Sequence, residues 1–208
     1  MSANFVGIIF ADSDGIAGMK ELLFKRTLAA VPFAARYRLV DFPLSNMTHA
    51  GAKNIGIIVK QSYQSLMNHV ASGAAWDLDR KYSGLWILPP FATENNVDTL
   101  YKHELEGLIA NRTFLKNLDE EYVLITESNT VANIDYARAV EEHIASGRAI
   151  SLLYTKKPRV AAPGVSRTFL RVGADHLVTD LIIGEEAPDD YVCGLNTVIL
   201  KRKDMISI

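Results

Sequence analysis

FVGIIF, residues 5–10, is an unbroken apolar run of strand length near the start of the chain. An apolar run of this length is typical of a strand buried on both faces of a parallel sheet, and it is too brief for a signal peptide or a membrane-spanning helix. Similar short runs recur at Ile55–Val59, Tyr122–Thr126 and Ala149–Tyr154. The sequence therefore predicts a core built from several buried strands.

Helical segments are expected after the first three of these runs, at Ala17–Thr27, Tyr63–Ala71 and Ile134–Ala145. Strands that alternate with helices indicate an α/β fold with a doubly wound, mostly parallel sheet of the Rossmann-like kind. The longest predicted helix, Val97–Leu118, repeats apolar residues close to a 3.6 period, so one face of it is expected to pack on the sheet.

The last third of the chain has a different pattern. Three strand signals lie close together at Thr168–Val172, Leu177–Ile183 and Tyr191–Leu200, which predicts an antiparallel extension of the sheet. Met205–Ile208 then looks like the first turn of an interrupted helix. We therefore interpret residues 1–208 as one domain that lacks its last portion.

Composition excludes several classes of function. Lys and Arg (22) nearly balance Asp and Glu (24), so no general positive field favours nucleic acid or an anionic membrane. Cys193 is the single cysteine, which excludes an internal disulfide and a cysteine zinc cluster and predicts a cytoplasmic protein. The five histidines lack the spacing of a zinc site, and we expect them at the surface or supporting other residues.

The segment AVPFAARYRLVDFPLSNMTHAG, residues 30–51, resembles the bacterial ADP-glucose pyrophosphorylases, which are glucose-1-phosphate adenylyltransferases. Matching stretches follow in family order at Ile55–Val59, Trp76–Arg80, Leu88–Pro90 and Tyr122–Ile125. The resemblance implies the nucleotide-diphospho-sugar transferase fold, with the family's C-terminal left-handed β-helix domain absent from this chain. It also implies a reaction in which ATP and glucose 1-phosphate give ADP-glucose and pyrophosphate with the help of Mg²⁺.

The residues that would carry this chemistry depart from the family pattern. The family's Gly-Gly-x-Gly-x-Arg-Leu loop keeps only Gly15 of its three glycines, and Ala17 replaces the arginine that neutralises pyrophosphate. Leu28 replaces a phosphate-binding lysine, and Asn129 replaces the aspartate that binds magnesium. Ala17, Leu28 and Asn129 are therefore degenerate catalytic positions, and weak or absent metal binding is expected.

Acidic residues near the phosphate loop strengthen this interpretation. Asp12 and Asp14 would repel a triphosphate, and we interpret Asp12, Ser13 and Asp14 as caps of the helix at Ala17–Thr27 rather than as magnesium ligands. Because successive residues of a strand point to opposite faces, the carboxylate of Glu127 is expected to face away from the magnesium site.

Several positions of the nucleotide pocket are still recognisable. The resemblance identifies Gly15, Asn95, Asn96 and Asp98 as remnants of this pocket, with Asn95 and Asn96 in place of a Gly-Thr pair. The aromatic residues Tyr82, Trp86, Phe91 and Trp76 could stack on a base or a sugar, but apolar packing is the favoured interpretation.

A cluster of cations suggests a second type of site. The resemblance places anionic effectors such as sugar phosphates near Lys20, Lys25, Arg36 and Arg38. The favoured alternative is that the cations of the helical segment are solvated and complement the dipole of its last turn. Arg38 and Asp41 flank a strand and are also placed to pair with each other.

Three hypotheses about function remain open. The first is a regulatory, catalytically degenerate subunit of the D type, which joins a catalytic homologous subunit in a mixed tetramer without nucleic acid or membrane. The second is an active sugar-phosphate nucleotidyltransferase with an altered phosphate loop, which Gly15, Asp98 and Asp135 keep open. The third is a sensor that binds ADP-glucose or glucose 1-phosphate without turnover.

Overall fold

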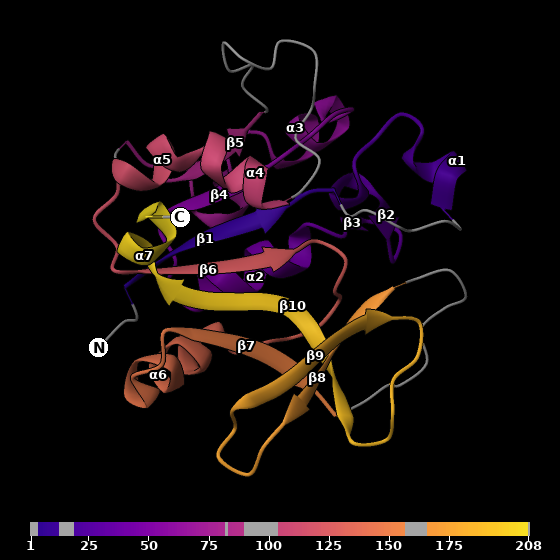
Figure 1. Cartoon of the computed structure of the whole chain (residues 1–208). Coiled ribbons are helices and arrows are strands. Elements are labelled where there is room, and N and C mark those ends of the chain that lie inside the picture. The colour runs from indigo at the N-terminus through magenta and orange to yellow at the C-terminus, as the bar shows by residue number, and fades with distance from the viewer. Residues whose placement is uncertain (1–3, 13–18, 82, 90–103, 157–165, 208) are drawn as a thin grey trace.

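The computed structural model describes residues 4–12, 19–81, 83–89, 104–156 and 166–207. Its centre is an eight-stranded mixed sheet in the order β5-β4-β1-β6-β10-β8-β9, with β7 also paired to β10 (Figure 1). The parallel half contains three strands predicted from the apolar runs, β1 (Phe5–Phe10), β4 (Ile55–Ile58) and β6 (Tyr122–Glu127), together with β5 (Leu85–Leu88), which was not predicted.

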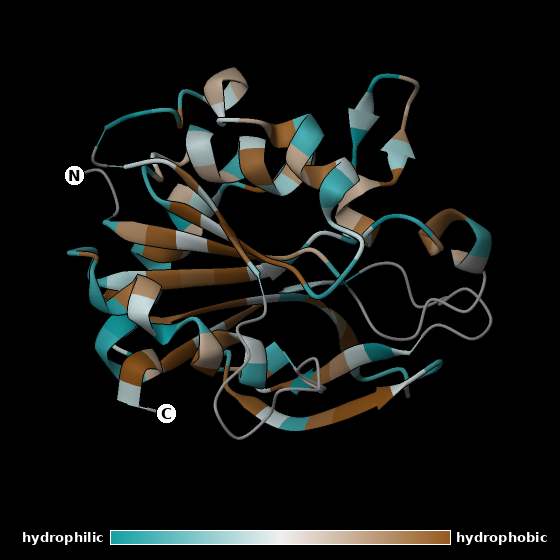
Figure 2. Ribbon diagram, turned by 90° about the horizontal axis from the view of Figure 1, so that it is seen from above, coloured by the Kyte–Doolittle hydropathy of each residue, from teal (hydrophilic) through white to brown (hydrophobic). Residues whose placement is uncertain are grey.

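Strand β1 is buried along its whole length because it lies between β4 and β6 and is covered on both faces. Phe5 and Ile9 belong to one hydrophobic cluster, whereas Val6 and Ile8 belong to the other. This alternation is the period of two that a strand imposes on its side chains. Figure 2 shows the apolar strands between two layers of helices, as expected for a doubly wound α/β fold.

The helices cover these two faces in separate groups. On one face lie α2 (Asp41–His49), α3 (Gln64–Val70) and α6 (Tyr136–Ser146), and on the other lie α4 (Glu104–Ala110), α5 (Arg112–Lys116) and α7 (Arg202–Ser207). Among the described helices, none is both long and apolar enough to cross a lipid bilayer.

The predicted antiparallel extension is confirmed. Strand β10 (Tyr191–Lys201) runs antiparallel to β6, to β7 (Ile150–Thr155) and to β8 (Arg167–Val172), and β8 in turn pairs with β9 (Val178–Gly184). The pairing of β10 with β7 shifts register between Gly194 and Val198. This irregularity lies beside the end of β6, so it shapes the surface next to that strand.

The prediction of one long helix at Val97–Leu118 is wrong over the described residues. The segment contains two helices: α4 ends at Ala110 and α5 begins at Arg112, with Asn111 between them. The carbonyl of Gly107 accepts from both the backbone N–H of Asn111 at 3.2 Å and its buried side-chain amide at 2.9 Å, and the N–H of Phe114 then bonds the carbonyl of Asn111, three residues back. Leu105 and Ile109 are exposed instead of packing on the sheet.

The helix predicted at Ala17–Thr27 is shorter than expected. Residues 13–18 lie outside the described part, and α1 (Lys20–Leu23) ends four residues early, so Lys25 lies in the turn that follows it. The chain continues through the 3₁₀ turn Leu28–Ala30 into a small hairpin of β2 (Pro32–Phe33) and β3 (Tyr37–Arg38). A second 3₁₀ turn spans Ala74–Trp76.

Candidate functional site

The carboxyl ends of β1, β4 and β6 meet at one edge of the sheet, where α/β proteins of this architecture bind ligands (Figure 1). Gly15 and Ala17 lie within residues 13–18, and Asn95, Asn96 and Asp98 lie within residues 90–103, all outside the described ranges. Described residues that flank the first of these segments, among them Asp12, line a cavity at this edge of the sheet.

The carboxylate of Asp12, which the sequence interpretation assigned to a helix cap, contacts a neighbouring strand in the described residues. Its Oδ2 accepts a hydrogen bond from the backbone N–H of Lys60 at 2.8 Å, and the N-cap of α1 is Met19, without a side-chain cap. The cause is the pairing of β1 with β4, because Ala11 donates to Ile58 and thereby brings Asp12 beside Lys60. The carboxylate therefore links the ends of two parallel strands.

A cavity of about 150 Å³ lies against this link. It is lined by Asp12, Leu23, Arg26, Leu28, Lys60, Gln61 and Ser62. Leu28 is buried, and its side chain offers no hydrogen-bond donor to this cavity. Arg26 and Lys60 nevertheless bring positive charge to the cavity from neighbouring positions, beside the negative charge of Asp12.

The prediction that Glu127 faces away from the magnesium site is wrong, because its carboxylate contacts Asn129. The amide of Asn129 donates to Glu127 Oε2, and the amide of Asn196 donates to Glu127 Oε1 at 2.8 Å. Glu127 and Asn129 are two positions apart, a spacing that puts side chains on the same face of a strand, and the turn that follows β6 keeps them close together. The end of β6 thus carries one carboxylate that accepts hydrogen bonds from two amides.

A second cavity, of about 240 Å³, opens between the end of β6 and the antiparallel strands. Its polar lining includes Glu127, Asn196 and Thr197, and its apolar lining includes Phe10, Ile125 and Leu170. Asn196 has a φ of 49°, a left-handed conformation that the irregularity of β10 imposes. A carboxylate, an amide and a hydroxyl above an apolar floor can hydrogen-bond a hydroxylated ligand such as a sugar.

Buried hydroxyl groups stiffen the strands behind this cavity. The Oγ1 atoms of Thr126 and Thr197 lie 2.8 Å apart and join β6 to β10. Burial raises the pKa of Tyr136, and the hydroxyls of Thr126 and Thr197 lower it by smaller amounts. Tyr136 therefore remains neutral near pH 7. Asp135, just before it, caps α6 by accepting from the N–H of Arg138 at 3.0 Å.

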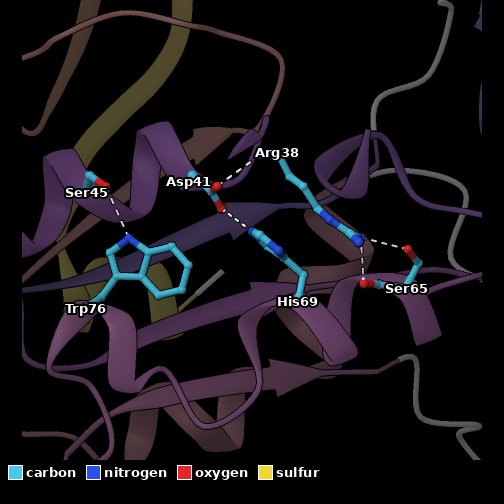
Figure 3. A network of polar contacts seen from close by, with 6 residues as sticks. All are labelled: Arg38, Asp41, Ser45, Ser65, His69 and Trp76. Carbon is cyan, nitrogen blue, oxygen red and sulfur yellow. Dashed lines mark hydrogen bonds and ion pairs between the residues drawn. The ribbon is translucent and has the colours of Figure 1, made fainter. Parts of the chain in front are cut away.

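Two of the four cations of the predicted effector site, Arg36 and Arg38, contact other residues of the protein. The guanidinium of Arg38 donates to the hydroxyl and the carbonyl of Ser65 at 2.7 Å, and it is the backbone N–H of Arg38 that bonds Asp41 (Figure 3). Arg36 lies over the ring of Tyr37 at 5.6 Å. Lys25 is exposed, and Lys20 begins α1 with a side chain outside the description.

Other predicted residues have mixed outcomes. Trp76 packs against the core and donates to the hydroxyl of Ser45 at 3.1 Å, whereas Trp86 is half-exposed; Tyr82 and Phe91 lie outside the described residues. His143 is buried with its Nδ1 2.7 Å from the hydroxyl of Ser151, and His69 contacts Asp41, so these two histidines support other residues, which was one of the two expectations. No period in the sequence distinguished His143 from the other histidines.

Comparison with known proteins agrees with this architecture. Residues 22–167 match the family described as nucleotidyl transferase. Glucose-1-phosphate adenylyltransferase of Halalkalibacterium halodurans is 32% identical over 76% of this chain, and the glycogen biosynthesis protein GlgD of Geobacillus stearothermophilus is 35% identical over 71%. These alignments cover 41% and 42% of the two relatives, so the chain spans about two fifths of their length.

A solved structure shares the fold. A Bacillus anthracis protein, described as a candidate glucose-1-phosphate thymidylyltransferase in complex with a sucrose, superposes with a TM-score of 0.68. The superposition covers 97% of this chain and 73% of that one, at 12% identity. The mixed sheet, its two helical layers and the sequence matches all agree, and the chain belongs to the nucleotidyl transferase family.

Proposed function

We propose that the chain is the nucleotidyltransferase-like part of a regulatory, catalytically degenerate subunit of glucose-1-phosphate adenylyltransferase in glycogen biosynthesis. The relatives named above include both adenylyltransferases and the glycogen biosynthesis protein GlgD, at similar identity. The whole subunit would act in the cytoplasm, in a mixed tetramer with a catalytic homologous subunit. A sugar phosphate near Lys25 and Arg36 is the proposed effector.

The position of Asp12 is the main support for a degenerate site. Its carboxylate is held at the end of β1 by Lys60, against the same small cavity as buried Leu28. Two like charges about 4 Å apart repel by about 4 kcal/mol at an effective dielectric of 20. A phosphate that entered this cavity would meet that repulsion without the lysine that the resemblance expects at position 28.

The donor set at the end of β6 does not suit a hard divalent cation. Asn129 offers a neutral amide, and the carboxylate of Glu127 already accepts from Asn129 and Asn196. Within the described ranges, no group of three or more His, Cys, Asp or Glu side chains is placed to hold a metal. Mg²⁺ prefers octahedral oxygen ligands that include carboxylates. We therefore propose that magnesium binding is weak or absent.

An activity assay tests the regulatory proposal. ADP-glucose formation is measured with the full-length protein alone, with the catalytic homologous subunit alone and with the mixture. We expect negligible turnover from this protein and an altered rate or effector response in the mixture. Substantial turnover by this protein alone would overturn the proposal, as would a mixture that behaves as the sum of its parts.

The second candidate function is an active nucleotidyltransferase with an altered phosphate loop. The observation in its favour is that Arg26 and Lys60 line the cavity beside Asp12 and could replace the missing cations. Calorimetry with ATP, UTP or dTTP and Mg²⁺ separates the candidates, because micromolar binding favours the active enzyme. Titrations with ADP-glucose and glucose 1-phosphate test the remaining sensor hypothesis in the same way.

A matched pair of variants sharpens this titration. Asp12→Asn removes the negative charge and keeps an oxygen that can accept from the N–H of Lys60. If repulsion by Asp12 opposes triphosphate binding, Asp12→Asn should bind ATP at least about tenfold more tightly, which corresponds to about 1.4 kcal/mol. Asp119→Asn, the same change at an exposed carboxylate, is the control and should leave ATP binding unchanged.

A further inference from the structure

A basic cavity of about 300 Å³ lies at the opposite end of the sheet from the candidate site. It is lined by Tyr122, His143, Ile144, Gly147, Arg148, Ala149, Lys201, Lys203 and Asp204. Figure 1 shows the elements around it, α6, α7 and the end of β10, at the end of the sheet away from the arrowheads of β1 and β6. It is therefore separate from the two cavities described above.

Three cations converge here from three different segments. Arg148 follows α6, Lys201 is the last residue of β10, and Lys203 lies in the first turn of α7. Asp204 is the single acidic residue of the lining. Over the ranges that the structure describes, no carboxylate lies within ion-pair distance of these three cationic side chains. The chain as a whole has a formal charge of −2, so this is a local excess of positive charge.

Helix dipoles do not account for this excess. Arg148 lies just beyond the C-terminus of α6, where a cation is favourable. Lys203, by contrast, lies at the N-terminal end of α7, where a cation is unfavourable. Lys201 lies on a strand and has no such role. A helix dipole therefore stabilises at most one of the three cations, Arg148.

The wall of the cavity is preorganised. The imidazole of His143 is buried, its Nδ1 lies 2.7 Å from the hydroxyl of Ser151, and its ring meets that of Tyr122 edge to face at 5.5 Å. Burial lowers the pKa of His143, and the positive charge of Lys201 adds to this effect. The imidazole of His143 is therefore neutral near pH 7 and is held in place in the wall of the cavity. Gly147 leaves open space, since no atom lies within 4 Å of the position that a Cβ would occupy.

We propose that this cavity binds a small phosphorylated anion, such as inorganic phosphate or a phosphate monoester. A phosphate carries up to two negative charges near neutral pH and several acceptor oxygens, so it can engage more than one of the cations at once. The cavity is concave and lies at the small end of the range for ligand pockets, which favours a small molecule over a polymer or a membrane surface.

Titration of the full-length protein with inorganic phosphate tests the site. Amide shifts are followed by NMR, and the melting temperature is compared with sodium chloride at equal ionic strength. We expect saturable shifts at Gly147 and Arg148 and a higher melting temperature, because a ligand that binds the folded state stabilises it. The double variant Lys201→Gln/Lys203→Gln should weaken phosphate binding at least about tenfold.

Lys53→Gln is the matched control, since Lys53 is an exposed lysine just before β4 that does not line the cavity. It should bind phosphate as the wild type does. Equal weakening by Lys53→Gln, no saturable effect in the wild type, or shifts centred on Lys25 and Arg36 would each overturn the proposal. If the double variant unfolds, exposed Lys203→Gln alone is tested against the same control. Turnover plays no part in this readout, so its result is independent of the proposed function.

Discussion

Removal of the Asp41 carboxylate should destabilise the fold strongly. Asp41 is only 8% exposed; its Oδ2 accepts from the N–H of Arg38 at 2.9 Å, and its Oδ1 lies 2.6 Å from His69 Nε2 (Figure 3). These contacts hold the hairpin, α2 and α3 together. Asp41→Ala leaves the backbone N–H of Arg38 and the imidazole of His69 without this carboxylate. The guanidinium of Arg38 bonds Ser65 and does not depend on Asp41.

The magnitude follows from the two contacts. A hydrogen bond to a charged group contributes about 1.5–3 kcal/mol, and the favourable position of Asp41 in the first turn of α2 adds about 0.3–1 kcal/mol. The side chain of His69 is 21% exposed, so water replaces part of what it loses. We therefore expect Asp41→Ala to lower the free energy of unfolding by about 3 kcal/mol.

Urea unfolding at pH 7, followed by circular dichroism, measures this change. Asp119→Ala removes an exposed carboxylate and should change stability by no more than about 0.5 kcal/mol. A double-mutant cycle with His69→Ala should show a coupling of about 1 kcal/mol. A loss below about 1 kcal/mol for Asp41→Ala, or strict additivity with His69→Ala, would refute the reasoning.

Three further predictions concern buried or neutral groups. Burial and the charge of Lys201 lower the pKa of His143, so the unfolded chain binds the extra proton first and stability should fall as the pH drops below about 6.5; His143→Gln should show a flatter pH profile in urea unfolding. Met47→Ala, at a fully buried position, should cost about 3 kcal/mol by the same assay, whereas Met67→Ala, 40% exposed, should cost less than about 1 kcal/mol. Asn129→Asp places a second carboxylate beside Glu127, so Mg²⁺ should raise the melting temperature of this variant over that in EDTA and leave the wild type unchanged.

Much of the fold could be predicted because its signals are local. The runs at Phe5–Phe10, Ile55–Val59 and Tyr122–Thr126 became parallel strands, since a strand buried on both faces must be apolar throughout, whereas the run at Ala149–Tyr154 became β7, which is only partly buried and pairs antiparallel with β10. The closely spaced strands after residue 166 became the antiparallel half. The apolar period predicted one helix at Val97–Leu118, but α4 and α5 are separated at Asn111, whose buried side-chain amide bonds the carbonyl of Gly107, a contact that an apolar pattern does not encode.

The candidate site was less predictable, because its contacts join residues that are distant in sequence. Asp12 had a local explanation as a helix cap, but the pairing of β1 with β4 brings it to Lys60, 48 residues away. Glu127 likewise accepts a hydrogen bond from Asn196, 69 residues away, and the alternation of strand faces does not predict that contact.

The sequence by itself determined the fold class and the family resemblance, because each depends on residue type and local order alone. Only the tertiary structure decided which partners the remaining polar groups have. It directed the Asp12 carboxylate to a neighbouring strand and brought Arg148, Lys201 and Lys203 around one cavity. Electrostatic and hydrogen-bonding energies depend on separation in space and on burial, and both are set by how the strands and helices pack.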